Sequence, residues 1–375
     1  MPPPTKAAVR GGKLLGSGAH GSFYSDVKND IQAFLPADPH AELTVYYLAP
    51  GAGKNSHMHV LHKRVHARDF LAHLARRGGP KLGFKYLRAP YLVQRLFHAG
   101  ETDFRNELAS IVNLSYMGLA FMRRETAQPL LTYRGTENIV GMRIDGGPEE
   151  KVAWLVLQRV CGGAVSSQRM TAADVGRMIL DILPTVGHLQ RHGYLHTDIH
   201  QDNVVEGCAL TPSRRYTLID WGEMKKISAG QELHHPTASF LSGMPLTLLA
   251  DHPYVYRLLM AHLDTLFTVR QLREPDGAVT VKERAHAAWL DGLTARLAGR
   301  YRAIIDQNKG SVDALVKRFR HRYDLYGLGT AAVQLMRRNG LVDPKLRAAV
   351  ECLWDPDSPC TDAAAALKRC KQLFA

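Results

Sequence analysis

The sequence lacks the features of several specialised protein classes. No apolar run approaches the roughly 20 residues that a membrane-spanning helix needs, and no repeat of about 20–50 residues indicates a solenoid or a propeller. Acidic residues are fewer than basic ones, 35 against 48, so the formal net charge is +13. Hydrophobic residues at 45% and charged residues at 22% are those of an ordinary folded protein. The 375 residues allow one large or two modest domains.

Cysteine is also sparse. The five cysteines are odd in number, widely scattered and without a C-x-x-C pair: Cys161, Cys208, Cys352, Cys360 and Cys370. Neither a disulfide framework nor a zinc site is indicated. The first residues contain no apolar stretch of the kind found in signal peptides. The sequence therefore predicts reduced thiols in an intracellular protein of the cytoplasm or nucleus, without membrane contact.

The pattern of elements changes along the chain. Glycine-punctuated, β-branched and aromatic runs predict strands, and one helix interrupts them at Phe104–Leu114; the strand runs are Leu14–Tyr24, Leu43–Leu48, Met58–Val65 and Ala153–Val160. Amphipathic helices follow at Ala172–Arg191, Tyr254–Leu272, Lys282–Ile305, Leu325–Arg338, Lys345–Leu353 and Asp362–Phe374. We expect an α+β fold with a small β-rich lobe (1–160) and a large helical lobe (161–375), joined by a hinge at Cys161-Gly162-Gly163.

The strongest chemical signal is the run HTDIHQDN at 196–203, followed by Ile219-Asp220-Trp221-Gly222. Asn203 lies five residues after Asp198, at the other end of one short loop. The 17 residues from Asn203 to Asp220 leave room for a hairpin that returns Asp220 to this loop. Phosphoryl transfer needs a carboxylate to orient the attacking hydroxyl and oxygen ligands for magnesium. These three side chains supply that set.

These motifs resemble the catalytic loop H-x-D-x-x-x-x-N and the D-F-G turn of the protein-kinase-like superfamily. The resemblance extends from Leu14 to Phe374. It implies a divergent serine/threonine protein kinase that uses ATP and Mg2+, and the rebuilt segments resemble kinases of large DNA viruses. Asp198 would orient and deprotonate the acceptor hydroxyl, while Asn203 and Asp220 would hold the metal.

The same resemblance implies a nucleotide site in the first lobe. A Gly-rich loop would cover the phosphates, Lys63 would bind them, Glu107 would position Lys63, and a strand with its hinge would line the adenine pocket. The residues are Gly16, Gly18, Gly21 and Phe23 in the loop, Leu61 and Lys63 on the third strand, Leu157 as gatekeeper, and Gln158 and Val160 at the adenine edge. Lys54 and Lys28 are rivals of Lys63. The long spacings imply insertions around 28–58 and 66–102.

Some positions depart from the kinase pattern. Thr197 replaces the usual arginine, and His200 stands where a lysine normally neutralises the transferring phosphate, so His200 would contribute charge when protonated. His200 and the Ile-Asp-Trp-Gly run also resemble aminoglycoside and choline kinases, so a small-molecule acceptor is an alternative. The Gly-rich loop favours the protein kinases. A catalytically inactive binding module is a third possibility, which the presence of all three polar residues disfavours.

The last third is rebuilt relative to a compact kinase. Asp324 resembles the acidic residue that hydrogen-bonds the catalytic-loop backbone. It follows Asp220 by 104 positions, a separation that includes an insertion at about 225–315. There is no Ala-Pro-Glu motif, and the turn at 357–360 lacks the arginine that would pair with its glutamate. The basic run 317–322 is typical of a solvated helix face, and its alternative interpretation is a docking patch for an acidic protein substrate or nucleic acid. Nucleic acid is not specifically indicated, and a monomer is expected.

Overall fold

The computed structural model divides the chain into two compact units, Met1–Gly162 and Gly163–Ala375. No helix among the described residues is long and apolar enough to cross a membrane. The structure describes residues 14–18, 21–24, 31, 34–36, 38, 40–50, 58–76, 82–87, 99–117, 131–133, 137–146, 152–159, 161–207, 214–222, 224–226, 288–290, 292–293, 296–297, 299–300, 303–304, 307 and 321–375.

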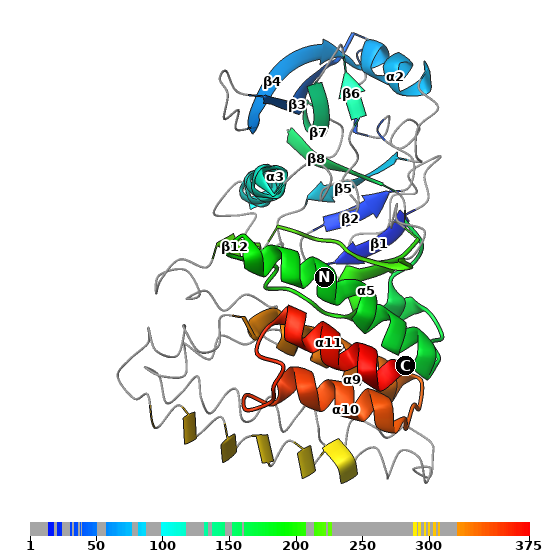
Figure 1. Ribbon diagram of the computed structural model, residues 1–375. Coiled ribbons are helices and arrows are strands. Elements are labelled where there is room, and N and C mark those ends of the chain that lie inside the picture. Colours follow the sequence, from blue (N-terminus) through cyan, green and yellow to red (C-terminus); the bar gives the residue numbers. More distant parts are fainter. Residues whose placement is uncertain are drawn as a thin grey trace. The chain divides into compact units, whose positions relative to one another are not determined.

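An 8-stranded antiparallel sheet forms the frame of the first unit (Figure 1). The strand order is β1-β2-β5-β8-β7-β3-β4, and β6 pairs with β7. The order is not the chain order, because the β3–β4 hairpin is inserted between β2 and β5 in sequence but lies at the far edge of the sheet. The strands are β1 Leu14–Gly18, β2 Gly21–Tyr24, β3 Glu42–Pro50, β4 Met58–His66, β5 Leu82–Leu87, β6 Leu131–Tyr133, β7 Glu137–Asp145 and β8 Val152–Arg159.

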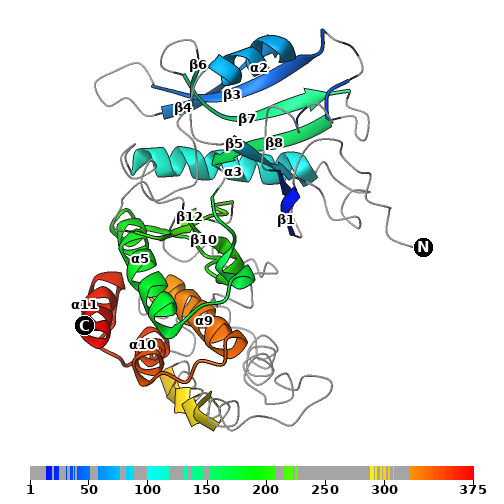
Figure 2. The ribbon, with the colours of Figure 1, turned by 90° about the vertical axis from the view of Figure 1, so that its right-hand side faces the viewer.

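Each face of this sheet is covered by a different helix, as Figure 2 shows with α2 (Ala67–Arg76) above the sheet and α3 (Ala99–Tyr116) below it. Since side chains alternate across a strand, neighbouring positions belong to opposite faces. On one face, Phe70 of α2 joins the buried cluster that contains Val45 and Leu155. On the other, the ring of Phe104 in α3 lies 5.0 Å from those of Tyr46 and Trp154. We call these the α2 face and the α3 face.

Helices dominate the second unit: α5 (Ala172–Arg191), α9 (Tyr323–Arg338), α10 (Pro344–Trp354) and α11 (Ala363–Phe374). Their starts follow from local chemistry. Thr171 and Asp174 form a capping box at α5, and the side chains of Asp343 and Asp362 accept the first free N–H groups of α10 and α11. The predicted α+β class, a β-rich part followed by a helical part, is confirmed.

The helices of the second unit pack into one core. The helix pairs α5–α11, α9–α10, α5–α9 and α10–α11 are in contact. The described positions between 288 and 307 are also helical, and Leu290, Leu293, Leu297 and Ile304 are buried at helical spacing. Trp289 of this segment donates from Nε1 to Glu351 of α10 at 3.2 Å. The predicted helix Tyr254–Leu272 and the basic positions 317–320 lie outside the described residues.

The prediction of reduced thiols is wrong for at least three cysteines. Cys352, near the end of α10, and Cys360, just before α11, form a disulfide whose Cα atoms lie 5.7 Å apart. Cys161 is also disulfide-bonded. Cys370 is a free, buried thiol, and burial raises its pKa to about 12. The scattered spacing gave no sign of these bonds, because disulfide pairing depends on the folded backbone rather than on local sequence.

Candidate active site

A short helix–loop–hairpin frame presents the polar residues of the second unit. After α5, the chain forms β9 (Tyr194–Leu195), the loop 196–203 with the one-turn 3-10 helix Gln201–Asn203, and the hairpin of β10 (Val204–Glu206) and β11 (Tyr216–Leu218). The buried carboxylate of Asp181 in α5 accepts the backbone N–H groups of Arg215 at 2.7 Å and Tyr216 at 3.2 Å. The hairpin is therefore fixed to the helix that precedes the loop.

Asn203 and Asp198 are in direct contact across the loop. The Nδ2 of Asn203 donates to the Asp198 backbone oxygen at 3.0 Å and to the Asp198 carboxylate at 2.9 Å. Because the amide nitrogen is engaged with Asp198, the amide oxygen is the atom that Asn203 offers to another ligand. The two side chains are oriented together, as their five-residue spacing predicted.

Asp220 is returned to this loop by the hairpin. The N–H of Ile219 donates to the Asn203 backbone oxygen at 2.9 Å, which places Asp220 one residue from that contact. Asp220 has a φ of 63°, in the left-handed region that Asp adopts more readily than most residues. Trp221 follows it and is buried, with its ring 4.7 Å from that of His196. The three polar residues of the sequence motif thus occupy one site.

His196 is the buried centre of the loop. Its side chain is fully inaccessible, its Nε2 lies 3.1 Å from the Ile219 oxygen, and its Nδ1 lies 3.3 Å from the Asp198 backbone nitrogen. Burial lowers the pKa of His196, although Asp198 and Asp220 oppose this shift. The neutral ring therefore connects the loop to Ile219, just after β11, and contributes no positive charge to the site.

Asp324 of α9 binds the backbone of the 196–203 loop. Its two carboxylate oxygens accept the backbone N–H groups of His196 at 2.9 Å and Thr197 at 3.0 Å. Burial raises the pKa of Asp324 to about 6, and the two N–H donors oppose that rise. Thr197 has a φ of 66°, which is costly for a β-branched residue. The structural role expected for Asp324 is thus visible in its contacts.

His200 is the charged member of the loop. Its Nε2 lies 3.5 Å from Asp198 Oδ2 and its Nδ1 lies 3.5 Å from Asp202 Oδ2. Burial opposes its protonation, but the bonds to the two carboxylates outweigh burial and raise the pKa of His200 to about 9. Its neutral form would instead accept the Asp202 N–H at 3.2 Å. Two flanking carboxylates favour the imidazolium at neutral pH, and its charge in turn lowers the pKa of Asp198 against the effect of burial.

The oxygen donors of this site fit a magnesium ion bound together with phosphates. Magnesium prefers carboxylate and carbonyl oxygens and usually takes only one or two protein ligands when phosphates complete its shell. The Asn203 amide oxygen and the Asp220 carboxylate have this chemistry, and the hairpin brings their backbones together. A bound ion of this kind would screen the negative charge of the phosphates.

The glycine-rich segment of the first unit forms a strand hairpin. Gly18 pairs with Gly21, and Gly16 pairs with Phe23 across β1 and β2, with a register irregularity between Leu14 and Gly16. Residues 19 and 20, at the tip, lie outside the described residues. The Gly-rich motif predicts a hairpin of this kind. Because glycine has no side chain, a ligand can approach the backbone N–H groups of the hairpin closely.

Lys63 and Glu107 are not brought together. Lys63 lies on β4, the edge strand, where it is paired with Val45 of the α2 face, and its Nζ lies 5.0 Å from the centroid of the Tyr47 ring. Glu107 is buried on α3, one turn after Phe104, and therefore on the helix side that faces the opposite surface of the sheet. The ion pair predicted between Lys63 and Glu107 is not supported by this arrangement.

Lys85 occupies the place in the sheet that the sequence analysis assigned to Lys63. Its strand, β5, lies between β2 and β8. In register, Lys85 is opposite Phe23 on one side and Val156 on the other. Val156 pairs in turn with Gly141, where an added Cβ would lie 2.8 Å from the Phe104 ring. This register row therefore belongs to the α3 face, and α3 is in contact with β5.

The remaining adenine-pocket predictions have mixed outcomes. Leu157 is buried in the cluster of the α2 face, so its side chain does not share the face of Lys85 and α3. This disfavours a gatekeeper role for Leu157. Leu61 is 47% exposed on the edge strand β4, far in strand order from the glycine hairpin. Gln158 lies on β8, paired with Gly83 of β5, and Val160 lies outside the described residues.

Sequence reasoning missed Lys85 and Arg322. Lys85 lies in the alternating run LGFKYL, which carries a strand signal, but the kinase resemblance places that run within the insertion predicted around 66–102. Arg322 belongs to the basic run 317–322, whose sequence alone does not indicate burial. It is in fact buried, with 5% of its surface exposed, at the start of the helix that carries Asp324.

Comparisons with known proteins give little further information. No protein-family model and no curated protein matches the chain. Among solved structures, the chain is similar to "ROP18 kinase domain in complex with AMP-PNP and sucrose", with 11% identity and a TM-score of 0.41 over 92% of this chain and 87% of that chain.

Proposed function

We propose that the chain is an ATP-dependent phosphotransferase of protein-kinase-like type that acts on protein serine or threonine hydroxyls. The observation that carries the proposal is the contact of Asn203 with both the backbone and the carboxylate of Asp198. This contact fixes a general base beside a magnesium ligand, while the hairpin returns Asp220 to the same place. A single capping or turn residue would not need this set of mutual contacts.

The residues of the loop would divide the work of in-line transfer. The Asp198 carboxylate would accept the hydrogen bond of the acceptor hydroxyl and take its proton as transfer proceeds. Its pKa is lowered by His200 despite burial, so the carboxylate is ionised at neutral pH. The His200 imidazolium would stabilise the charge of the transferring phosphoryl group, in place of a lysine. Asn203 and Asp220 would hold Mg2+, which neutralises phosphate charge when bound.

The nucleotide would be held by the first unit. The β1–β2 hairpin would cover the phosphates with backbone N–H groups, and Lys85 would bind the α- and β-phosphates. Three features support Lys85 over Lys63: its strand adjoins the glycine hairpin, its register row is on the α3 face, and Glu107 follows it by 22 residues instead of 44. Glu107 would orient Lys85 by an ion pair.

Three features of the chain bear on the class of acceptor. The glycine hairpin favours a protein kinase, and the excess of basic residues favours an acidic protein substrate. His200 beside Asp198 is the specific feature that favours a second candidate, a small-molecule phosphotransferase of the aminoglycoside or choline kinase type. The domain limits 1–160 and 161–375 and the monomeric state remain part of the proposal.

The disulfides change the proposed location of the protein. Disulfides form and persist in oxidising compartments and are rare in the cytosol and nucleus. The Cys352–Cys360 bond and the bonded state of Cys161 therefore support folding in a secretory compartment rather than in the cytoplasm. A non-reducing peptide map of protein from its native source should contain a cross-linked peptide joining 352 and 360; free thiols at both positions would contradict this location.

The activity is tested with labelled ATP and Mg2+, supplied separately with acidic protein acceptors and with a panel of amino alcohols. We expect label on protein serine or threonine, and a loss of about 10²–10⁴-fold in rate for Asp198→Asn. Asp362→Asn is the matched control, because Asn caps a helix as well as Asp. Transfer only to amino alcohols would overturn the acceptor class. Binding of Mg-ATP without any turnover would favour the inactive binding module.

A further inference from the structure

The turn between α10 and α11 is closed by several independent bonds. The Cys352–Cys360 disulfide spans eight residues. Inside it, Ser358 Oγ donates to the Cys352 oxygen at 2.7 Å, and the Ser358 N–H donates to the Asp355 oxygen at 3.0 Å. Asp362, just beyond the disulfide, caps α11 by accepting the Ala365 N–H at 2.8 Å. The backbone oxygens of this turn are therefore held in fixed positions.

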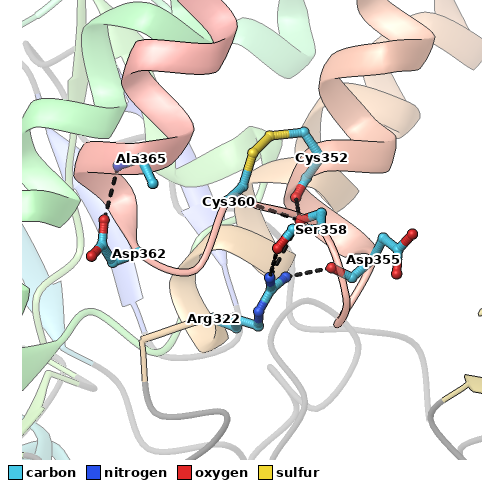
Figure 3. Close-up of a disulfide and its surroundings, with 7 residues drawn as sticks. All are labelled: Arg322, Cys352, Asp355, Ser358, Cys360, Asp362 and Ala365. Atoms are coloured by element: carbon cyan, nitrogen blue, oxygen red, sulfur yellow. Dashed lines mark hydrogen bonds between the residues drawn. A yellow bond between two sulfur atoms is a disulfide. The ribbon is translucent and has the colours of Figure 1, made fainter.

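Arg322 binds those oxygens from the start of α9, as Figure 3 shows. Its Nη1 donates to the Asp355 backbone oxygen, and its Nη2 donates to the Ser358 oxygen at 2.8 Å. The planar fork of a guanidinium suits two acceptors side by side, which a lysine ammonium does not match. Since Arg322 is almost fully buried, moving it away from these acceptors would leave a charge without its partners, at a large cost. The start of α9 is thus tied to the disulfide-closed turn.

The start of α9 is also the part of the molecule that sets the 196–203 loop. Asp324 lies two residues after Arg322, and its carboxylate holds the N–H groups of His196 and Thr197. Thr197 is kept in a left-handed conformation that a threonine avoids without such support. A displacement of the Asp324 carboxylate would allow Thr197 to relax and would turn the adjacent Asp198.

We propose that Arg322 is a positioning residue for the reaction: held by the turn that the Cys352–Cys360 disulfide closes, it places Asp324 and, through Asp324, the catalytic loop. The inference rests on the proposed function. In this proposal Arg322 acts through Asp324, whose carboxylate binds the loop backbone.

The test compares Arg322→Met with Arg300→Met in the full chain with its disulfides formed. Arg300 also binds Asp355, but through the side-chain carboxylate and from the 288–307 segment. Among the described residues Arg300 makes no direct bond to Arg322 or Asp324, and it does not bind the backbone oxygens that hold Arg322. For Arg322→Met we expect kcat to fall about 10–100-fold with the KM for ATP unchanged, because a small misplacement of a catalytic group costs about that much. Arg322→Lys should recover part of the loss, and Arg300→Met should leave kcat unchanged.

A second readout is independent of turnover. Amide hydrogen exchange of His196 and Thr197 reports their bonds to Asp324, and we expect it to accelerate at least about tenfold in Arg322→Met but not in Arg300→Met. If the wild-type chain transfers no phosphate, the proposed function fails while exchange still decides the positioning role. Unchanged exchange and kcat in Arg322→Met, with only a lower Tm, would overturn it. If Arg322→Met does not fold, the milder Ser358→Ala and the Cys352→Ala/Cys360→Ala pair must show the same two effects, and their absence refutes the proposal.

Discussion

Two lysines of the same sheet, Lys63 and Lys85, are candidates for binding the nucleotide phosphates, and substitution of each one distinguishes between them. Four strand spacings separate β5 from β4, which at about 4.8 Å per spacing is about 19 Å. Lys63 also lies on the α2 face, opposite the side to which α3 is docked. No rotamer of Lys63 could carry its ammonium group from β4 to the position of β5 and also around the edge of the sheet to the α3 face. Lys85 is already on β5, next to the glycine hairpin, and its register row is on the α3 face.

We therefore expect Lys85→Met to lower kcat/KM for ATP by about 10–150-fold, since a hydrogen bond to a charged group contributes about 1.5–3 kcal/mol. Lys63→Met removes the contact of this edge-strand lysine with the Tyr47 ring and should change kcat/KM less than about twofold. Steady-state kinetics with an acidic protein acceptor measures both variants. Loss of activity in Lys63→Met, with Lys85→Met unaffected, would refute the reasoning from strand order and face.

Other predictions concern charge and packing. The pKa of His200 is raised to about 9 in the folded chain, so its contribution to the free energy of unfolding is complete below about pH 6.5 and is lost as the pH rises through 9. Denaturant titrations should show this loss, up to about 3 kcal/mol, in the wild type and not in His200→Gln. Asp324 has a raised pKa of about 6, so its ionisation costs stability above pH 6 and that cost disappears as the pH falls towards 4; Asp324→Asn should remove this pH dependence. Gly141→Ala places a Cβ 2.8 Å from the Phe104 ring and should cost about 1–3 kcal/mol in thermal unfolding. Gly299→Ala, whose Cβ meets no atom of the described residues within 4 Å, should not destabilise.

The second unit was largely predictable because its signals are local. The apolar period predicted α5 with the bounds that it has, and the predicted hairpin after Asn203 is present as β10 and β11. The polar set Asp198, Asn203 and Asp220 lies within a few residues of turns whose geometry follows from spacing. Such features depend on short stretches of chain, which a single sequence specifies well.

The first unit was harder because strand order is not a local property. The run around Lys63 has the pattern of a strand lysine, but nothing in it shows that a whole hairpin and α2 are inserted before the strand that pairs with β2. The gatekeeper role predicted for Leu157 is disfavoured by the face on which Leu157 lies, because one residue along a strand exchanges the two faces of the sheet. The disulfide at Cys352 joins two helix ends whose approach only the packed helices define.

The carboxylate of Asp324 joins segments that are far apart in the chain, and this separation has a consequence for the order of events during synthesis. Thr197 and its acceptor Asp324 are 127 residues apart. At ribosomal rates of about 5–20 residues per second, the acceptor emerges on the order of 6–25 s after the loop. Until then the Thr197 N–H has no carboxylate of Asp324 to bind, so the left-handed backbone of Thr197 is not stabilised by that bond. The nascent chain should therefore gain its active geometry only after the start of α9 has been made, and a chain released before that point should be inert.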